Sequence, residues 1–352
     1  TDLSLNISSP RFLAARMNGS ELVDVEVEAP DTAVDPVAAI LENEGANGSF
    51  LLEGGTNGNI KKINAGTFIG VDEGPGKRTG IQAFLENNIV SMMAVPGITT
   101  PEVMVSLISH CENTRSRFAV LDMPKELYKT KDLLDYRSMV DSSYAAMYHP
   151  WVQVFDRAAN KPAFVPPSGA VMGVYSRTDI ARGVHKAPAN EIVQCTGLSF
   201  NYTTEEQDIL NPEGVNLIRA LPGQGIRIWG ARTASSNSSF RYVNVRRLFI
   251  FVEESIKANT NWVVFEPNDA TLWQRVSLTV SSFLDGLWRN GMLAGGSAAE
   301  SYFVEIGPST MSREDIMSGK LICNIGIAPS RPAEFVIFRV TQHTAEAAAS
   351  EE

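Results

Sequence analysis

The segment from Asn261 to Val340 constrains the fold most, because it contains a long amphipathic helix pattern. Between Thr271 and Leu293, apolar residues recur at the i, i+3, i+4 spacing that places them on one helix face. They are Leu272, Val276, Val280, Phe283, Leu284 and Leu287. Asn268 or Asp269 can cap the first turn, since a short acceptor side chain satisfies free backbone amides there. The apolar stripe must pack against another layer, because docking rather than helix propensity stabilises such a helix in water.

Short strand patterns lie on both sides of this helix. The residues predicted as strands are Trp262–Phe265 before it, and Tyr302–Ile306, Leu321–Ile327 and Glu334–Val340 after it. The sequence therefore predicts a C-terminal α/β assembly domain over residues 259–342.

Between about residue 60 and residue 260, strand patterns alternate with helix patterns. The predicted strands are Ile89–Val95, Arg117–Leu121 and Ala145–Phe155, the last interrupted at Pro150, with a strand pair Asn216–Arg219 and Ile226–Trp229. The predicted helices are Pro101–Cys111, Lys129–Val140, Ser168–Ala181 and Arg246–Lys257. This alternation indicates a mixed α/β fold with parallel strand pairing, and we assign it to residues 56–258.

The two ends of the chain differ from this core. Residues 1–55 have short alternating runs separated by turn residues, which predicts a small β-rich segment. Residues 343–352 are rich in Ala and Glu and are expected to be disordered.

Composition limits the possible functions. The 352 residues are 44% hydrophobic and 20% charged, which is typical of a folded globular protein, and the net charge is −10. An acidic chain is not expected to bind nucleic acid generally, since neutralising phosphates requires surplus Lys and Arg. No apolar run approaches the roughly 20 residues of a membrane-spanning helix, and the first residues do not have the pattern of a signal peptide. Three widely spaced cysteines, Cys111, Cys195 and Cys323, favour reduced thiols over a disulfide framework.

Motifs for catalysis or cofactor binding are incomplete. The run Gly74–Gly80 is the nearest to a phosphate-binding loop. When the Gly-Lys pair of that motif is aligned on Gly76 and Lys77, Val71 stands where the first Gly is needed and Arg78 stands where Ser or Thr is needed. The four histidines lack the His-Glu-x-x-His spacing of a zinc site, and no Gly-x-Ser-x-Gly elbow surrounds Ser168. We therefore predict no catalytic, cofactor-binding or metal residues. An α/β enzyme built on residues 60–260 is the alternative.

Several blocks of sequence resemble the contractile tail sheath family of bacteriophages, pyocins and related injection systems. In chain order they are Pro166–Gly169, Lys186–Asn190, Gly230–Thr233, Tyr242–Leu248, Asn261–Asp269 with Leu272 and Trp273, and Pro329–Val336. The resemblance covers roughly residues 55–342. The usual N-terminal portion of the family, including its linking arm, is not recognisable. The chain begins partway through the protein, or that portion has diverged, or another chain supplies it.

The resemblance implies a structural subunit without cofactors that forms stacked hexameric rings around an inner tube and contracts to drive the tube through an envelope. The implied partners are other copies of the chain, the inner tube protein, and baseplate and tail-terminator proteins, with no nucleic acid and no membrane insertion. The implied location is assembly in the bacterial cytoplasm, and then a virion tail or a released injection particle. A sheath-like adaptor at the baseplate or tail end is the alternative within the same family.

Family members also link subunits by strands and face the tube with a C-terminal helix. The candidate inter-subunit strand is Glu334, Phe335, Val336, Ile337, Phe338, Arg339 and Val340. It is largely apolar on both faces, which suits a strand added to a neighbour's sheet. The alternative is a central strand of its own domain. Arg275, Arg289, Arg246 and Arg247 are candidate contacts to the tube or a neighbour, against the alternative that they are solvated helix charges.

Overall fold

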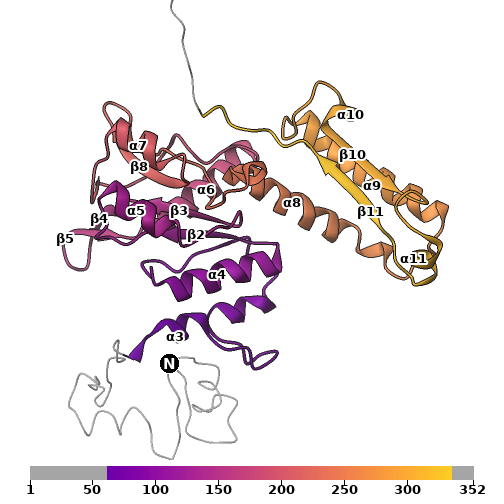
Figure 1. The fold of residues 1–352 in the computed structure, drawn as a ribbon, viewed down its shortest axis with the longest axis horizontal. Coiled ribbons are helices and arrows are strands. Elements are labelled where there is room, and N and C mark those ends of the chain that lie inside the picture. Colours follow the sequence, from indigo (N-terminus) through magenta and orange to yellow (C-terminus); the bar gives the residue numbers. More distant parts are fainter. Residues whose placement is uncertain (1–61, 335–352) are drawn as a thin grey trace, which may run out of the picture. The chain divides into compact units, whose positions relative to one another are not determined.

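The computed structural model describes residues 62–334 (Figure 1). The predictions for residues 1–55 and 343–352, and those for the strand residues after Glu334, lie outside this range.

A six-stranded sheet organises residues 92–228, with the strand order β1-β2-β3-β8-β9-β6. The strands are β1 (Met92–Met93), β2 (Phe118–Asp122), β3 (Ala145–His149), β8 (Val215–Leu221), β9 (Gly225–Ile228) and β6 (Glu191–Ile192). The pairs β1-β2, β2-β3 and β3-β8 are parallel, whereas β8-β9 and β6-β9 are antiparallel. The predicted parallel pairing and the predicted strand pair around residue 223 are therefore confirmed. Only Met92–Met93 of the predicted strand Ile89–Val95 pairs in the sheet.

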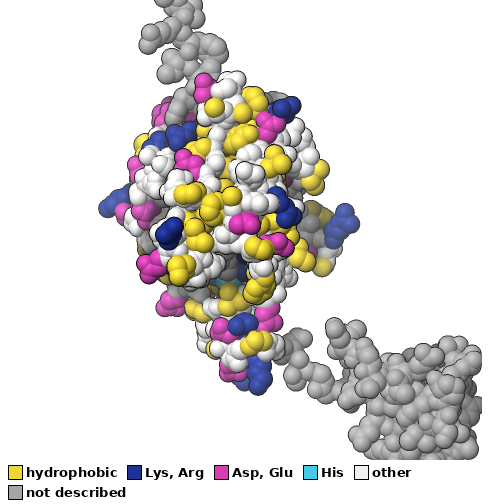
Figure 2. All heavy atoms as spheres, turned by 90° about the vertical axis from the view of Figure 1, so that its right-hand side faces the viewer, with side chains coloured by type: hydrophobic (Ala, Val, Ile, Leu, Met, Phe, Trp, Pro, Cys, Tyr) yellow, Lys and Arg dark blue, Asp and Glu magenta, His cyan; other side chains and the backbone are white. Residues whose placement is uncertain are grey.

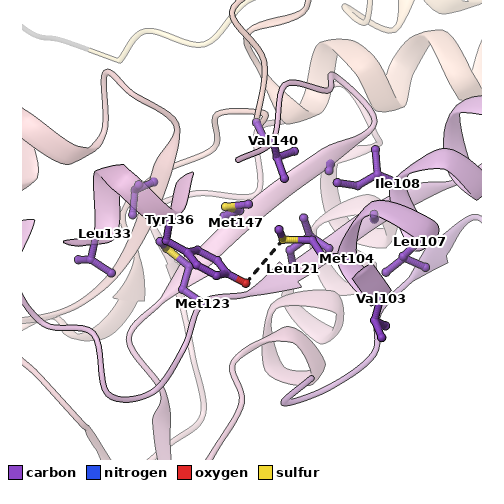
Figure 3. Close-up of a cluster of buried hydrophobic side chains, with 14 of the residues drawn as sticks. Val103, Met104, Leu107, Ile108, Leu121, Met123, Leu133, Tyr136, Val140 and Met147 are labelled. Atoms are coloured by element: carbon purple, nitrogen blue, oxygen red, sulfur yellow. Dashed lines mark hydrogen bonds between the residues drawn. The ribbon is translucent and has the colours of Figure 1, made fainter. Parts of the chain in front are cut away.

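Helices cover both faces of this sheet. They are α4 (Pro101–Thr114), α5 (Thr130–Arg137), α6 (Ser168–Arg182), α7 (Thr204–Leu210) and α8 (Val243–Asn259). Alternate residues of β2 point to opposite faces: Ala119 and Leu121 join a core with α4, α5 and α7, whereas Phe118 and Val120 join one with α6 and α8. In the first core the Tyr136 hydroxyl donates to the Met104 sulfur at 3.7 Å (Figure 3). All residues of β2 and β3 are buried, as expected of parallel strands between two helix layers.

Smaller elements flank the main sheet. A three-stranded antiparallel sheet contains β4 (Val152–Asp156), β5 (Lys161–Val165) and β7 (Gly197–Leu198). The helical pieces are α3 (Ala65–Ile69), η2 (Gly80–Glu86) and η3 (Ser238–Phe240). The predicted extended segment Ala145–Phe155 is thus two strands, β3 and β4, in two sheets, with Pro150 between them.

The C-terminal region consists of a long helix packed on a two-stranded sheet (Figure 1). Its elements are η4 (Asn261–Val263), α9 (Ala270–Arg289), α10 (Ala298–Ser301), β10 (Tyr302–Ile306), α11 (Arg313–Met317) and β11 (Cys323–Ile327). Asp269 caps α9, because its carboxylate accepts from the Leu272 amide at 2.9 Å. The predicted apolar stripe of α9 is confirmed: it packs with Leu248 and Val252 of α8 in a third core. The helix stops before the predicted Leu293, since Gly291 adopts a positive φ of 72°.

The strand predicted at Trp262–Phe265 is wrong. Asn261–Val263 form a turn of 3₁₀ helix, and Phe265 has a φ of +71°, which no strand residue adopts. The cause is local: the Val263 amide bonds back to the Thr260 carbonyl at 3.0 Å, closing the connection between two packed helices. Trp262 and Val263 still pack against the third core, so the apolar run serves a helix connection rather than a sheet.

Candidate assembly site

The β10–β11 sheet has one covered face and one open face. Tyr302, Val304 and Ile306 turn toward the third core, whereas Phe303 on the other face is 54% exposed. The Phe303 ring lies over its cross-strand partner Gly326, where a Cβ atom would come within 2.0 Å of it. Within residues 62–334, neither outer edge of this pair is joined by a third strand. Its backbone donors and acceptors are therefore available to an added strand.

After β11 the chain turns back toward α8 as a strap, which we define as residues 328–334. The Ala328 amide donates to the Ser301 carbonyl at 2.8 Å, and the Ala328 carbonyl accepts from the Ala294 amide at 2.8 Å. Further on, the Asn244 amide group of α8 donates to the Ser330 carbonyl at 3.2 Å. The strap thus joins the C-terminal sheet to the part of the chain that precedes it.

The strap ends at a latch, which we define as Glu334 with Arg232, Asn211 and Tyr242. One Glu334 oxygen accepts from Arg232 Nε at 2.8 Å and from Asn211 Nδ2 at 2.6 Å. The other accepts from Arg232 Nη2 at 2.7 Å and from the Tyr242 hydroxyl at 3.0 Å. Burial alone would raise the pKa of Glu334, but these donors and the charge of Arg232 outweigh it, so its pKa lies below the usual value. The carboxylate is therefore ionised and fully bonded at neutral pH.

Arg232 is itself fixed to the central sheet. Its third nitrogen, Nη1, donates to the Pro212 carbonyl at 2.8 Å. The side chain of Asn216 in β8 forms two hydrogen bonds with the Arg232 backbone. It accepts from the Arg232 amide and donates to the Arg232 carbonyl, each at 2.7 Å. The latch thus connects the first residue of the predicted inter-subunit strand to the central sheet of its own chain.

Sequence reasoning named Glu334 only as part of the candidate inter-subunit strand, and it missed the partners that Glu334 has within its own chain. Arg232 and Tyr242 were each recognisable only as parts of family-like blocks, and they lie about a hundred residues before Glu334 in the chain. The available signal was a single arginine in the otherwise small and apolar run Gly230–Thr233, which predicts a buried partner of opposite charge.

Arg246 and Arg247 are buried within the chain. The Arg247 guanidinium forms a bidentate pair with Asp179 at 2.9 and 2.5 Å and lies over the Tyr175 ring. Arg246 bonds Ser143 and lies 3.5 Å from the centre of the Phe240 ring. These contacts give both side chains a role in joining α8 to the central layer. Their predicted contacts with a tube or neighbour stay predictions.

Arg275 and Arg289 lie on the outer side of α9. Arg289 pairs with Asp285 one turn earlier at 2.7 Å and is 72% exposed. Arg275 lies over the Trp262 ring, 4.5 Å from its centre. Seen from the side on which α9 to α11 lie in Figure 1, exposed hydrophobic side chains are mixed with charges of both signs (Figure 2).

The loop between α8 and α9 exposes the aromatic side chain of Phe265, which the sequence analysis assigned to a strand. Phe265 is fully exposed, at 103%, beside Val264 at 64%. The loop is anchored after Phe265, at Asn268: Trp273 Nε1 donates to the Asn268 side chain at 2.7 Å, and Asn268 Nδ2 donates to the Lys320 carbonyl at 2.9 Å.

The predicted chemical alternatives find little support in the described part of the chain. The Ser168 hydroxyl donates to the Asp122 carboxylate at 2.8 Å, and the same carboxylate accepts the Ser168 amide at the start of α6. Burial raises the pKa of the Cys111 thiol to about 12, which keeps it protonated and unreactive. A cleft of about 750 Å³ lies between α5, α7 and the residues around Ser235. In this cleft the Asp141 carboxylate accepts hydrogen bonds from the Ser236 amide and hydroxyl. Residues 62–334 contain no cluster of three potential metal ligands and no helix long and apolar enough to cross a bilayer.

Comparison with known families assigns the described region from residue 73 onward. Residues 73–234 match the phage tail sheath protein central domain, and residues 235–343 match the phage tail sheath C-terminal domain. The chain belongs to the phage tail sheath family. Arg232 thus lies in the central domain match, and Glu334 lies in the C-terminal one. The resemblance, the mixed α/β fold and the structural, non-enzymatic nature of this sheath protein are confirmed.

Relatives of this sheath protein occur in phages, prophages and injection systems. A putative prophage major tail sheath protein of Pseudomonas aeruginosa (strain UCBPP-PA14) is 27% identical, covering 79% of this chain and 73% of the relative. The sheath complex of an extracellular contractile injection system, PVC, in the contracted state is 35% identical, covers 75% of each chain, and has a TM-score of 0.68. A chain of the 6-fold symmetrised baseplate of the anti-feeding prophage is also 35% identical, with a TM-score of 0.63, covering 72% of this chain and 69% of that one.

Proposed function

We propose that this sheath protein polymerises as stacked hexameric rings around an inner tube and contracts to drive that tube through a target envelope. The observation that carries the proposal is the β10–β11 sheet of this family member. Within residues 62–334, no third strand pairs with either of its edges. Main-chain bonds to an added strand would keep subunits joined while they rotate about their interfaces. Assembly takes place in the bacterial cytoplasm, and the product is a virion tail or a released injection particle.

The strand that completes a neighbour's sheet is the segment from Glu334 to Val340. Its first residue is fixed by the latch, and the residues after it, apart from Arg339, are apolar on both faces, which suits burial between two layers. Inner tube, baseplate and tail-terminator proteins are the other partners of the assembled sheath.

The proposal is tested by deleting residues 335–342 and expressing the chain with its tube protein. The deletion is expected to abolish long sheaths in negative-stain electron micrographs while leaving a folded subunit, because the missing strand belongs to the lattice. Deleting residues 344–352 instead removes a tail of similar length and is the matched control, which should assemble normally. Normal sheaths from the first deletion would disprove the linking strand.

An adaptor ring at the baseplate is a second candidate, because the relative in the anti-feeding prophage baseplate is as similar in sequence as the one in the PVC sheath complex. The number of copies per particle separates the two roles. Quantitative mass spectrometry of purified particles should find this chain in many rings if it is the main sheath. A number equal to one or a few rings would identify the adaptor.

A further inference from the structure

The hydrogen bonds of the latch differ from the other strap contacts in how they resist a pulling force on the chain. The strap bonds at Ala328 and Ser330 lie one after another along the chain, and each joins neutral groups. A force that peels the strap breaks such bonds one at a time. At Glu334 four bonds meet on one carboxylate, and three of the four donor atoms belong to groups fixed in the central domain before residue 235. These bonds must break together, and bonds to a charged group are individually stronger.

The latch also lies directly before the proposed linking strand. Residues 335–340 follow Glu334 in the chain as that strand. Any pull by a neighbour on that strand reaches Glu334 before it reaches residues 328–333. Through Arg232 the force reaches the Pro212 carbonyl and Asn216 of β8. The strand β8 pairs with β3 over residues 215–217 and with β9 over residues 218–221.

We propose that Glu334 is the anchor of the linking strand, and that its pairing with Arg232 transfers load from a neighbouring subunit into the central sheet. Without the pairing, the same load would peel residues 328–334 away from α8 and disturb the β10–β11 sheet that receives another neighbour's strand. The latch residues act by positioning the strand and not by contacting the neighbour. This inference rests on the proposed function, since it assumes that residues 335–340 join subunits.

The principal test is Glu334→Gln in full-length protein assembled with its tube. Glutamine keeps the size of the side chain but loses the charge, and its amide nitrogen cannot accept from Arg232, so one of the two Arg232 bonds is lost. We expect sheaths to form, and after triggered contraction we expect the fraction of broken or shortened sheaths to rise roughly tenfold, the equivalent of losing about one charge-assisted bond. Electron microscopy before and after contraction gives both fractions.

The matched control is Glu86→Gln. Glu86 pairs with Arg78 at 2.9 Å in a local loop that is not connected to the strap, so its loss should leave sheath breakage unchanged. Tyr242→Phe is a milder variant that removes a single latch bond of 3.0 Å, and it should give an intermediate breakage even if Glu334→Gln fails to fold.

The outcomes separate this inference from the proposed function. If Glu334→Gln and Tyr242→Phe sheaths survive contraction like the wild type, while deletion of residues 335–342 still prevents assembly, the latch does not carry load. If that deletion assembles normally, the linking strand itself is disproved. A loss of thermal stability in the free Glu334→Gln subunit without increased breakage would assign the latch to folding alone.

Discussion

The central sheet and the β10–β11 sheet differ in how much of their faces other elements of the chain cover. β2 and β3 are buried at every residue and have helices on both faces. β10 alternates between half-buried and exposed residues, and α9 covers only one side of the pair. A two-stranded sheet is marginal by itself in water, so α9 and whatever joins its edges must stabilise it.

This contrast separates two tasks within one chain. The central sheet is enclosed by helices of its own chain, whereas the C-terminal sheet has no third strand within residues 62–334, and we propose that its edges receive strands of other chains. Three predictions test this division, and they begin with the largest effect.

The same residue type occupies both sheets, which allows a matched comparison. Phe118 of β2 is fully buried, and Phe303 of β10 is 54% exposed. Phe118→Ala should lower the free energy of unfolding of the free subunit by ~3–5 kcal/mol, because it leaves a cavity in a packed core. Phe303→Ala should cost ~1 kcal/mol or less, since the ring loses only its contact with Gly326. Urea unfolding followed by tryptophan fluorescence measures both, and equal losses would contradict the division of tasks.

The central sheet also contains a histidine that should make its stability depend on pH. His149, at the end of β3, is fully buried, and burial lowers its pKa from 6.5 to about 4. Between these two values the unfolded chain binds a proton that the folded chain rejects. The stabilisation is therefore complete above pH 6.5 and is lost as the pH falls toward 4, by about 3 kcal/mol. Unfolding in urea at pH 7 and at pH 4.5 measures the loss.

The control for this prediction is His149→Gln, which does not titrate. The difference in unfolding free energy between the two pH values should shrink in this variant, although carboxylates elsewhere still contribute. An unchanged difference would show that His149 is not the group responsible.

The smallest effects are expected on the outer side of α9. Arg289→Glu and Arg275→Glu should each change subunit stability by only ~0–1 kcal/mol, since an exposed ion pair and an exposed ring contact are lost. Thermal unfolding measures this for the free subunit. If the double variant also contracts and retains its tube normally, both residues are solvated helix charges. Loss of the tube with an intact subunit would instead support the predicted contact.

Periodic patterns predicted most of the fold. The stripe on α9 and the strand β10 were predictable because one buried face imposes a spacing of 3.6 or 2 residues on the sequence. The strand prediction for Trp262–Phe265 failed because four consecutive apolar residues fit a buried strand as well as a helix connection that packs on a core. Its outcome depended on hydrogen bonds within the connection, which leave no periodic signal.

The assembly site was predictable only in part. The apolar character of Phe335 to Val340 is local and visible in the sequence. The latch depends on Arg232, Asn211 and Tyr242 meeting Glu334 across about 90 to 120 residues, a proximity that only the folded chain creates. Similarly, Arg246 and Arg247 fit an exposed helix face by charge, but the chain supplies Asp179 and Ser143 to bury them.

The main chain connects the central sheet and the β10–β11 region twice, once through α8 and once through residues 328–334. A single cut in the exposed loop beside Phe265 would therefore not release the C-terminal piece. The fragment that begins at Glu266 would still be bound through the α8–α9 core and through Glu334 in its pocket of donors. The two fragments would migrate together on a sizing column until denaturant separated them, so a nicked subunit would still have both of its domains in place.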